Sequence, residues 1–480
     1  MPSSPSIRPL VLSLAVTLVS SAACLAQGTP SAGPLPPAVA QQATALQKKA
    51  LEGTRAFDVV RSLTVEVGPR SAGSAGDRAA VAWGVKKLQE LGFSNVRAEK
   101  VTVPHWERGP ESGEIVSPWP QPVALAALGG SVGTPAEGIT AEVIEVPTLD
   151  ALASVEAARV KGKIVFFSNR MERTKDGSGY GRAVGVRGAG PSAAAKLGAV
   201  AVLIRSVGTD NNRTPHTGST RYQDGVEKIP AAALSNPDAD LLAAQVASGK
   251  PVTFRLKLGA RHLGEAESAN VIGEIPGREK PGEIVLLGCH LDSWDLGTGA
   301  IDDGAGCAIM AEAARLIGQL PVKPRRTIRV VFYANEEFGL SGARAYAEAH
   351  KNELASHILA GESDFGSGRV WRLASRVDPE ALPAVGEITR LLSPLKVEQG
   401  NNETGGGADL SPLAPARVPV VSLSQDGTYY FDWHHTANDT LDKIDPKDLD
   451  QNVAAWATVA YVAAEMPGTF GRAPEAAGRE

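Results

Sequence analysis

The amino-acid sequence predicts an α/β fold with a doubly wound, mixed and mostly parallel sheet. Strands and helices alternate from Asn270 onward. Three segments in this region are nearly all apolar, as expected of central strands that are covered on both faces; they are residues 284–288, 327–334 and 418–424. A helical segment over residues 305–320 follows the first strand, where a crossover to a parallel strand requires one. We therefore expect helices to flank a central sheet.

The chain before this region predicts two further parts. Residues 46–109 have the pattern of helix, Gly/Ser loop, helix and strand, with an amphipathic helix that ends near Gly92. Residues 110–263 contain short strands, many glycines and brief helices, which is typical of a small α/β module inserted into a larger domain. The larger domain is expected to comprise residues 46–109 and 264–470, followed by a C-terminal tail over 471–480.

The N-terminal residues predict export to the periplasm or the medium. Arg8 precedes the apolar run 10–19, and small residues follow it, an order typical of a secretory signal peptide over residues 1–26. The run is too short to span a membrane, which takes about 20 apolar residues. The alternative is a lipoprotein anchor at Cys24, although the usual leucine three residues earlier is absent. The Pro/Ala-rich residues 27–45 are expected to be a linker or pro-segment.

The composition argues against a nucleic-acid-binding protein, a membrane-spanning protein and a disulfide-rich scaffold. The 480 residues are 43% hydrophobic and 21% charged with a net charge of −5, so nothing favours nucleic acid, which requires a basic patch. No later apolar stretch is long enough to span a membrane, and residues 453–464 predict a buried helix instead. Only Cys289 and Cys307 remain beyond the signal peptide, too few for a disulfide scaffold, so stability must come from a hydrophobic core.

Histidine and acidic residues follow the predicted strands at their carboxyl ends. His290 follows the first apolar strand, Glu336 and Glu337 follow the second, and Asp364 follows another. Ligands bind at this edge of an open α/β sheet. We expect five segments to converge there, carrying His290, Asp302, Glu337, Asp364 and His435.

This set of residues suits two zinc ions. Zinc accepts imidazole nitrogen and carboxylate oxygen at about 2.0–2.2 Å. Two ions roughly 3.5–4 Å apart can share one carboxylate, so one bridging acid plus one acid and one imidazole per ion complete the set. Glu336 and Glu337 are adjacent and point in different directions on an extended backbone, which leaves one free as a general base. Each motif alone is typical of a solvated surface or a turn; their ordered joint occurrence favours a site.

Several segments resemble metallopeptidase family 28, a family of dinuclear zinc exopeptidases. "GPRSAGSAGDRAAVAW" resembles the family's opening, and "GKIVFF" and "AAAKLGAVAVLI" resemble a protease-associated domain. The segments similar to the catalytic blocks are "HLDSWDLGTGAIDDGAG", "NEEFGLSGARAY", "ESDFGSG" and "HHTANDTLDKIDP". The resemblance implies the zinc-exopeptidase fold with an inserted protease-associated domain, and it makes the larger domain the catalytic one. It also implies a homodimer that acts on dipeptides or short peptides.

The resemblance further implies a role for each residue. His290 and Asp364 would hold one zinc, Glu337 and His435 the other, with Asp302 as the bridge. Glu336 would be the general base. Asp292 would orient His290, because such a partner fixes the tautomer of a metal-bound imidazole.

The adjacent histidines of "WHHT" need separate consideration. His435 stands four residues before Asp439, the spacing that the family shows for its last ligand. Many relatives carry a tyrosine before that ligand, and its hydroxyl donates to the oxyanion; here the position is His434. His434 is therefore either an oxyanion donor or a packing histidine, and both interpretations stay open.

Two other functions share this fold. Glutaminyl cyclases use one zinc, and the full ligand set argues against them. A catalytically inactive receptor or binding protein is the alternative from another class, and it predicts lost ligands, whereas this chain has lost none of them.

Overall fold

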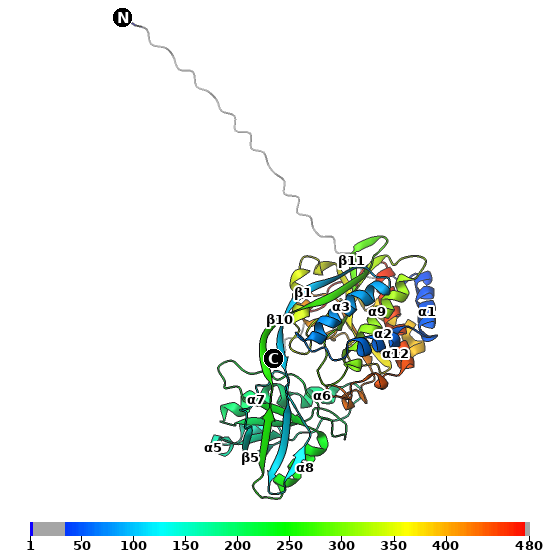
Figure 1. Ribbon diagram of the computed structural model, residues 1–480. Coiled ribbons are helices and arrows are strands. Elements are labelled where there is room, and N and C mark those ends of the chain that lie inside the picture. Colours follow the sequence, from blue (N-terminus) through cyan, green and yellow to red (C-terminus); the bar gives the residue numbers. More distant parts are fainter. Residues whose placement is uncertain (3–33, 476–480) are drawn as a thin grey trace.

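The computed structural model describes residues 1–2 and 34–475, which form two units that each contain an eight-stranded sheet (Figure 1). The expected signal peptide and Cys24 fall on residues 3–33 and so lie outside the described residues, as do the last residues of the expected tail, 476–480. Across the described ranges no helix is both long and apolar enough to cross a membrane.

The first sheet has the order β1-β10-β12-β11-β13-β16-β14-β15. Its four central strands, from β12 to β16, pair in parallel, whereas β1 with β10, β10 with β12, and β14 with β16 pair antiparallel. The strands are β1 (Ser94–Glu107), β10 (Arg261–Ile275), β11 (Lys280–His290), β12 (Arg326–Tyr333), β13 (His357–Glu362), β14 (Val370–Arg376), β15 (Glu398–Gln399) and β16 (Val420–Gln425). The predicted mixed α/β class is confirmed.

The central strands are buried on both faces, as their apolar sequences predict. Every residue of β12 is buried, and β11 is buried from Ile284 onward. In the parallel register His290 lies beside Tyr333, and Gly288 lies beside Glu362. The strands β11, β12 and β13 therefore end at the same edge, which brings the residues that follow them together.

Helices cover the first sheet (Figure 1). They are α1 (Pro37–Leu51), α2 (Ala56–Glu66), α3 (Ala75–Glu90), α9 (Ala305–Gly318), α10 (Ser341–Ala349), α11 (Leu382–Leu392) and α12 (Pro446–Glu465). In α12 residues 453–464 are all buried, which confirms the predicted buried helix. The ring of Trp456 lies against β13, where a Cβ on Gly361 would come within 2.4 Å of it. Glycine at this position therefore permits the close packing of α12 on the sheet.

Within the range 27–45, predicted to be a linker or pro-segment, residues 37–45 form the first part of α1. Pro37 stands at the first helical position, where its missing N–H leaves no bond unmade. Val39, Ala43 and Leu46 recur at helical spacing and are buried, and α1 packs against α12. The apolar face of this helix outweighs the Pro/Ala-rich composition that suggested a linker.

The second unit lies in the chain between β1 and β10. These two strands pair along almost their whole length and run from the first sheet toward the second unit (Figure 1). The second sheet has the order β3-β2-β9-β5-β6-β7-β8-β4. Its strands are β2 (Glu111–Ser117), β3 (Gln121–Val123), β4 (Leu125–Ala127), β5 (Ile139–Val146), β6 (Ile164–Phe167), β7 (Ala201–Arg205), β8 (Ala231–Leu234) and β9 (Thr253–Leu258). Its helices are α4 (Leu149–Ala153), α5 (Ala157–Val160), α6 (Ser178–Ala183), α7 (Gly185–Lys196) and α8 (Asn236–Ala247). We call these elements the inserted unit.

Candidate metal centre

The five predicted ligand residues come together at the carboxyl edge of the first sheet. His290 is the last residue of β11, Glu337 follows β12, and Asp364 follows β13. Asp302 precedes α9, and His435 lies in the turn before α12. All except His290, which is almost fully buried, line a cavity of about 290 Å³ together with Glu336 and His434.

Asp302 lies at the middle of this cluster. Its Oδ1 is 3.1 Å from His290 Nε2, and its Oδ2 is 3.3 Å from His435 Nε2. Asp364 Oδ1 is 3.4 Å from the same nitrogen of His290, and Glu337 Oε2 is 3.2 Å from that of His435. The side chains thus form two groups, each with one imidazole and one carboxylate, and Asp302 contacts both.

Buried charges in the cluster stabilise one another. Burial disfavours the charged form of His290, but Asp364 and Asp302 outweigh it and raise its pKa well above the ordinary value. In the same way Glu337 and Asp302 raise the pKa of His435 to about 10. The pKa of Asp302 is held well below its usual range, because the two imidazoles outweigh burial. Divalent cations bound to the same nitrogen and oxygen donors would likewise balance the charge of the carboxylates.

Two oxygen atoms of the cluster have no hydrogen-bond partner among the described residues. They are Asp302 Oδ2 and Glu337 Oε1, and both are buried. A buried unpaired acceptor carries a desolvation cost of about 1–3 kcal/mol, so such atoms are expected to bind an ion or water. The donor set of imidazole nitrogens and carboxylate oxygens is the one that zinc prefers.

The backbone around Asp302 is held by two further carboxylates. A cis peptide bond joins Asp302 to Asp303. Asp303 accepts a hydrogen bond from the N–H of His290 at 3.2 Å, and Asp439 accepts two, both at 2.7 Å, from residues 300–301. These contacts fix the main chain on both sides of the central acid.

Sequence reasoning missed Arg70 and the pairing of the two cysteines. Arg70 is completely buried and donates to the carbonyl groups of Leu291 and of residues 298–299 at 2.5 to 2.8 Å. It therefore holds the loop between β11 and Asp302. Cys289 and Cys307 form a disulfide that links β11 to α9. The only signal for Arg70 was its place in the "GPRSAG" segment, since it is not a ligand type.

Asp292 acts on His290 mainly through its main chain. His290 Nδ1 donates to the carbonyl oxygen of Asp292 at 3.0 Å, whereas the carboxylate is 3.7 Å away. The carboxylate instead accepts the N–H groups of Glu336 at 3.0 Å and Glu337 at 3.3 Å. Asp292 thereby connects the ends of β11 and β12, a role that the sequence did not indicate.

Glu336 and Glu337 have different surroundings. Glu337 contacts His435, whereas the Glu336 side chain lines the cavity and makes no hydrogen bond or ion pair with another residue in the range 34–475. Burial, together with the carboxylates of Asp364 and Glu337, raises the pKa of Glu336 well above its ordinary value. A carboxylate that lines a cavity and has a raised pKa is able to take up and release a proton.

The surroundings of His434 are compatible with both predicted roles, an oxyanion donor and a packing histidine. Its ring stacks on His435 with centroids 3.5 Å apart, and its Nε2 is 3.6 Å from Asp302 Oδ2. Burial lowers the pKa of His434 well below its ordinary value, which favours the neutral ring. Its Nδ1 has no hydrogen-bond partner in the described structure. His434 lines the cavity but, unlike His435, makes no ion pair with Glu337 in the described residues.

The inserted unit reaches into the same cavity. Thr217 N–H donates to the carbonyl oxygen of His435 at 3.0 Å, and His435 Nδ1 is 3.3 Å from the carbonyl oxygen of Thr217. Arg187 and Arg221 line the cavity beside the acidic cluster. The sequence of this unit, which predicts only a small inserted α/β module, gave no indication of these contacts.

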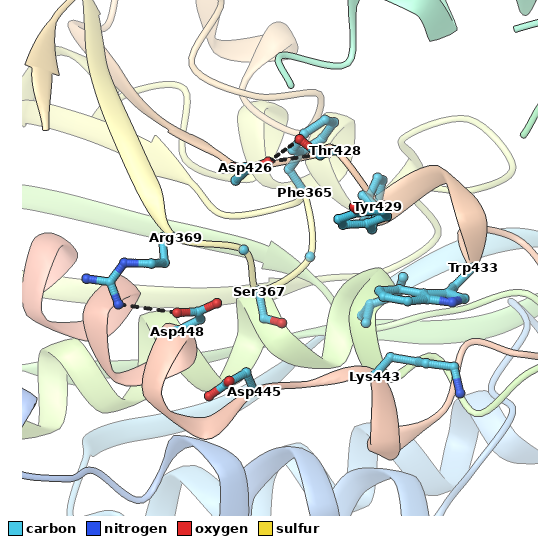
Figure 2. Close-up of a pocket in the computed structure, with 14 residues that line it drawn as sticks. Phe365, Ser367, Arg369, Asp426, Thr428, Tyr429, Trp433, Lys443, Asp445 and Asp448 are labelled. Carbon is cyan, nitrogen blue, oxygen red and sulfur yellow. Dashed lines mark hydrogen bonds and ion pairs between the residues drawn. The ribbon is translucent and has the colours of Figure 1, made fainter. Parts of the chain in front are cut away.

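A second cavity of about 340 Å³ adjoins the first and shares Phe365 and Tyr430 with it. Figure 2 shows its aromatic wall at Tyr429 and Trp433 and the ion pair of Arg369 with Asp448 at 3.2 Å. The other charged groups of this cavity also have partners: Lys443 pairs with Asp442, Asp445 caps α12, and Asp426 accepts from Thr428. Each charged group that lines this cavity thus has a hydrogen-bond or ion-pair partner.

Comparison with known proteins identifies the family. A family model described as "Peptidase family M28" matches residues 270–460. Carboxypeptidase Q from Mus musculus is 39% identical over 412 residues, which cover 86% of each chain. The crystal structure of a peptidase M28 precursor from Shewanella amazonensis is 50% identical with a TM-score of 0.90, covering 91% of this chain and 99% of the other. A zinc aminopeptidase from Bacillus subtilis, 21% identical with a TM-score of 0.62 and covering 86% and 94%, shares the fold.

Asp292→Asn tests the connection between β11 and β12. The N–H groups of Glu336 and Glu337 bond different oxygens of Asp292, and asparagine replaces one of these oxygens by an NH2 donor. The N–H group that faces this donor loses its acceptor, which costs about 1–3 kcal/mol. We expect lower stability of the metal-free protein in urea and about 10–100-fold weaker zinc binding.

Asp295→Asn is the matched control, because Asp295 pairs with Arg108 at 2.7 Å and contacts none of the five cluster residues. It should leave zinc binding unchanged. Equal zinc affinity in the two variants would contradict the role given to Asp292.

Proposed function

The chain belongs to peptidase family M28, and on that premise we propose that it is a dinuclear zinc exopeptidase with two Zn2+ ions per chain. It would hydrolyse dipeptides or short peptides, with Glu336 as the general base. One observation carries the proposal: two imidazole–carboxylate groups meet at a shared carboxylate, Asp302. The alternative, an inactive binding protein of the same fold, is not favoured, because the complete donor set is present.

The residues present fit two zinc ions. His290 and Asp364 would hold one ion, and Glu337 and His435 the other, with Asp302 bridging them. Support comes from Asp302 Oδ2 and Glu337 Oε1, which are buried and accept no hydrogen bond from the described residues, and from the nitrogen and oxygen donors that face one another. The Nδ1 contact of His435 with Thr217 and that of His290 with the Asp292 carbonyl leave both Nε2 atoms free for metal.

In the proposed mechanism Glu336 and His434 have different roles. Bound zinc would polarise the scissile carbonyl and lower the pKa of the attacking water to about 7. Glu336 takes the proton from this water and delivers it to the leaving amine. His434, as a neutral imidazole, donates an N–H to the oxyanion, which requires a distance of about 2.7–3.1 Å.

The cavity favours short peptides. Its volume of about 290 Å³ suits a small ligand, and it combines the acidic cluster with Arg187 and Arg221. The Arg221 side chain makes no ion pair with an acid in the described ranges and is exposed, so it is available to a substrate carboxylate. A substrate with a free carboxyl terminus would be consistent with similarity to a relative named carboxypeptidase Q.

The remaining parts of the proposal rest on the family resemblance. The inserted unit, over residues 110–263, would be a protease-associated domain, and the larger domain formed by residues 46–109 and 264–470 would be catalytic. The protein would be exported and would form a homodimer.

Metal analysis tests the proposal directly. Zinc-loaded protein is expected to contain two ions per chain and to lose peptidase activity when a chelator removes them. Asp302→Ala should lose both ions, because this carboxylate contacts both groups. Asp442→Ala, at an exposed position, is the control. Full activity with a single ion would rule out the dinuclear centre.

The roles of Glu336 and Glu337 can be distinguished by the zinc content of their variants. Glu336→Gln is expected to keep both ions and to lower kcat by about 10²–10⁴-fold, because only the proton transfer is lost. Glu337→Gln should lose zinc, since it removes a charged donor beside His435. The opposite pattern would exchange the two roles.

The roles of His434 and His435 can be distinguished in the same way, by zinc content and kcat. His434→Ala is expected to lower kcat by about 10²–10³-fold while zinc content and KM stay near normal, as for loss of an oxyanion donor. His435→Ala should lose one zinc. A normal kcat in His434→Ala would instead favour packing as its role and leave the donor function to Tyr430, which lines the same cavity.

A further inference from the structure

The inserted unit holds both peptide groups that flank His435. His216 Nδ1 is 2.7 Å from the carbonyl oxygen of His434, and Thr217 N–H donates to the carbonyl oxygen of His435 at 3.0 Å. A carbonyl oxygen can only accept, so Nδ1 of His216 carries the proton and donates it. Two consecutive residues of the inserted unit therefore fix two consecutive peptide groups of the opposite unit.

The ring of His216 is itself held on several sides. Its Nε2 is 2.6 Å from Asp210 Oδ1, and the two side chains are 0% and 3% exposed. Asn236 Nδ2 donates to the carbonyl oxygen of Asp210 at 3.1 Å, which ties this pair to the start of α8. A Cβ on Gly208 would come within 2.3 Å of the His216 ring, so a glycine is required for the ring to lie there. Both ring nitrogens are bonded, and the ring has no freedom to rotate.

The turn at His435 needs such support. Its φ of 63° lies in the left-handed region, where a residue with a side chain stays only when its surroundings determine the conformation. Rotation of either flanking peptide group would move the imidazole away from Asp302 and Glu337, which are 3.3 and 3.2 Å from its Nε2. The bonds from His216 and Thr217 oppose both rotations.

We propose that His216, oriented by Asp210, is a positioning residue for the candidate metal centre, so that the inserted unit helps to build that centre. The inference rests on the proposed function, because it concerns the same ligand. It assigns to the inserted unit a part in the chemistry, in addition to any effect on access or association. The donor is the N–H of His216, and its target is the peptide group between His434 and His435.

Three variants test the proposal. His216→Ala removes the donor, whereas in His216→Asn the side-chain amide N–H takes a place close to that of Nδ1. His262→Ala is the control, since His262 also belongs to a strand leading from the inserted unit and bonds a carbonyl, that of Gly130, but is exposed. Zinc affinity, kcat, KM and amide hydrogen exchange over residues 427–439 are measured for each.

His216→Ala is expected to weaken binding of one zinc by about 10–100-fold and to lower kcat with little change in KM. In metal-free protein the amides of residues 427–439 should exchange faster than in the wild type. His216→Asn should restore most of these values, and His262→Ala should match the wild type.

Unchanged zinc affinity and exchange in His216→Ala would overturn the proposal. So would equal losses in the Ala and Asn variants, because filling of space rather than the donated hydrogen bond would then matter. The exchange experiment contains no metal. If wild-type protein bound no zinc, the proposed function would fail, while the exchange rates would still decide whether His216 holds the turn.

Discussion

Burial of several carboxylates beside one another is the constraint on which the structure depends. A carboxylate that leaves water without a partner takes up a proton or destabilises the fold by several kcal/mol. Here Asp302, Asp364 and Glu337 each face an imidazole nitrogen at 3.1 to 3.4 Å, which offsets part of the lost hydration. The two imidazoles outweigh burial at Asp302, whereas burial still raises the pKa values of Asp364 and Glu337. The same arrangement provides the donors for divalent cations. The cluster is therefore stable only in the folded protein, where strands and loops that are far apart in the chain place these side chains in contact.

The main chain supplies the second source of compensation. Asp292, Asp303 and Asp439 are buried, and each accepts backbone N–H groups from a segment that carries a candidate ligand or the base. Burial next to Asp302 raises the pKa of Asp439 to about 7 even so. Arg70 completes the arrangement, since its fully buried guanidinium satisfies three carbonyl groups of the loop that precedes Asp302. Residues outside the set of five candidate ligands thus fix the positions of the main-chain segments that carry those ligands and Glu336.

The two units are joined at the site as well as by β1 and β10. The turn that carries His435 exchanges hydrogen bonds with Thr217, and Arg187 and Arg221 line the same cavity from the inserted unit. Both units therefore contribute residues to the lining of the cavity. A change in the relative position of the units would therefore alter both the shape of the cavity and the orientation of His435.

The sequence by itself determined the fold class, the strands β11, β12 and β16, the buried helix α12 and the candidate residues at the strand ends. These depend on apolar periodicity and on the rule that parallel strands end at one edge, and both are properties of short segments. Only the tertiary structure decided that residues 37–45 join α1, that the Asp292 carbonyl rather than its carboxylate bonds His290, and that Thr217 bonds His435 across 218 positions. The physical reason is that such contacts depend on which surfaces meet after packing. No local pattern of residue types encodes the direction of a carbonyl group or the partner of a buried arginine.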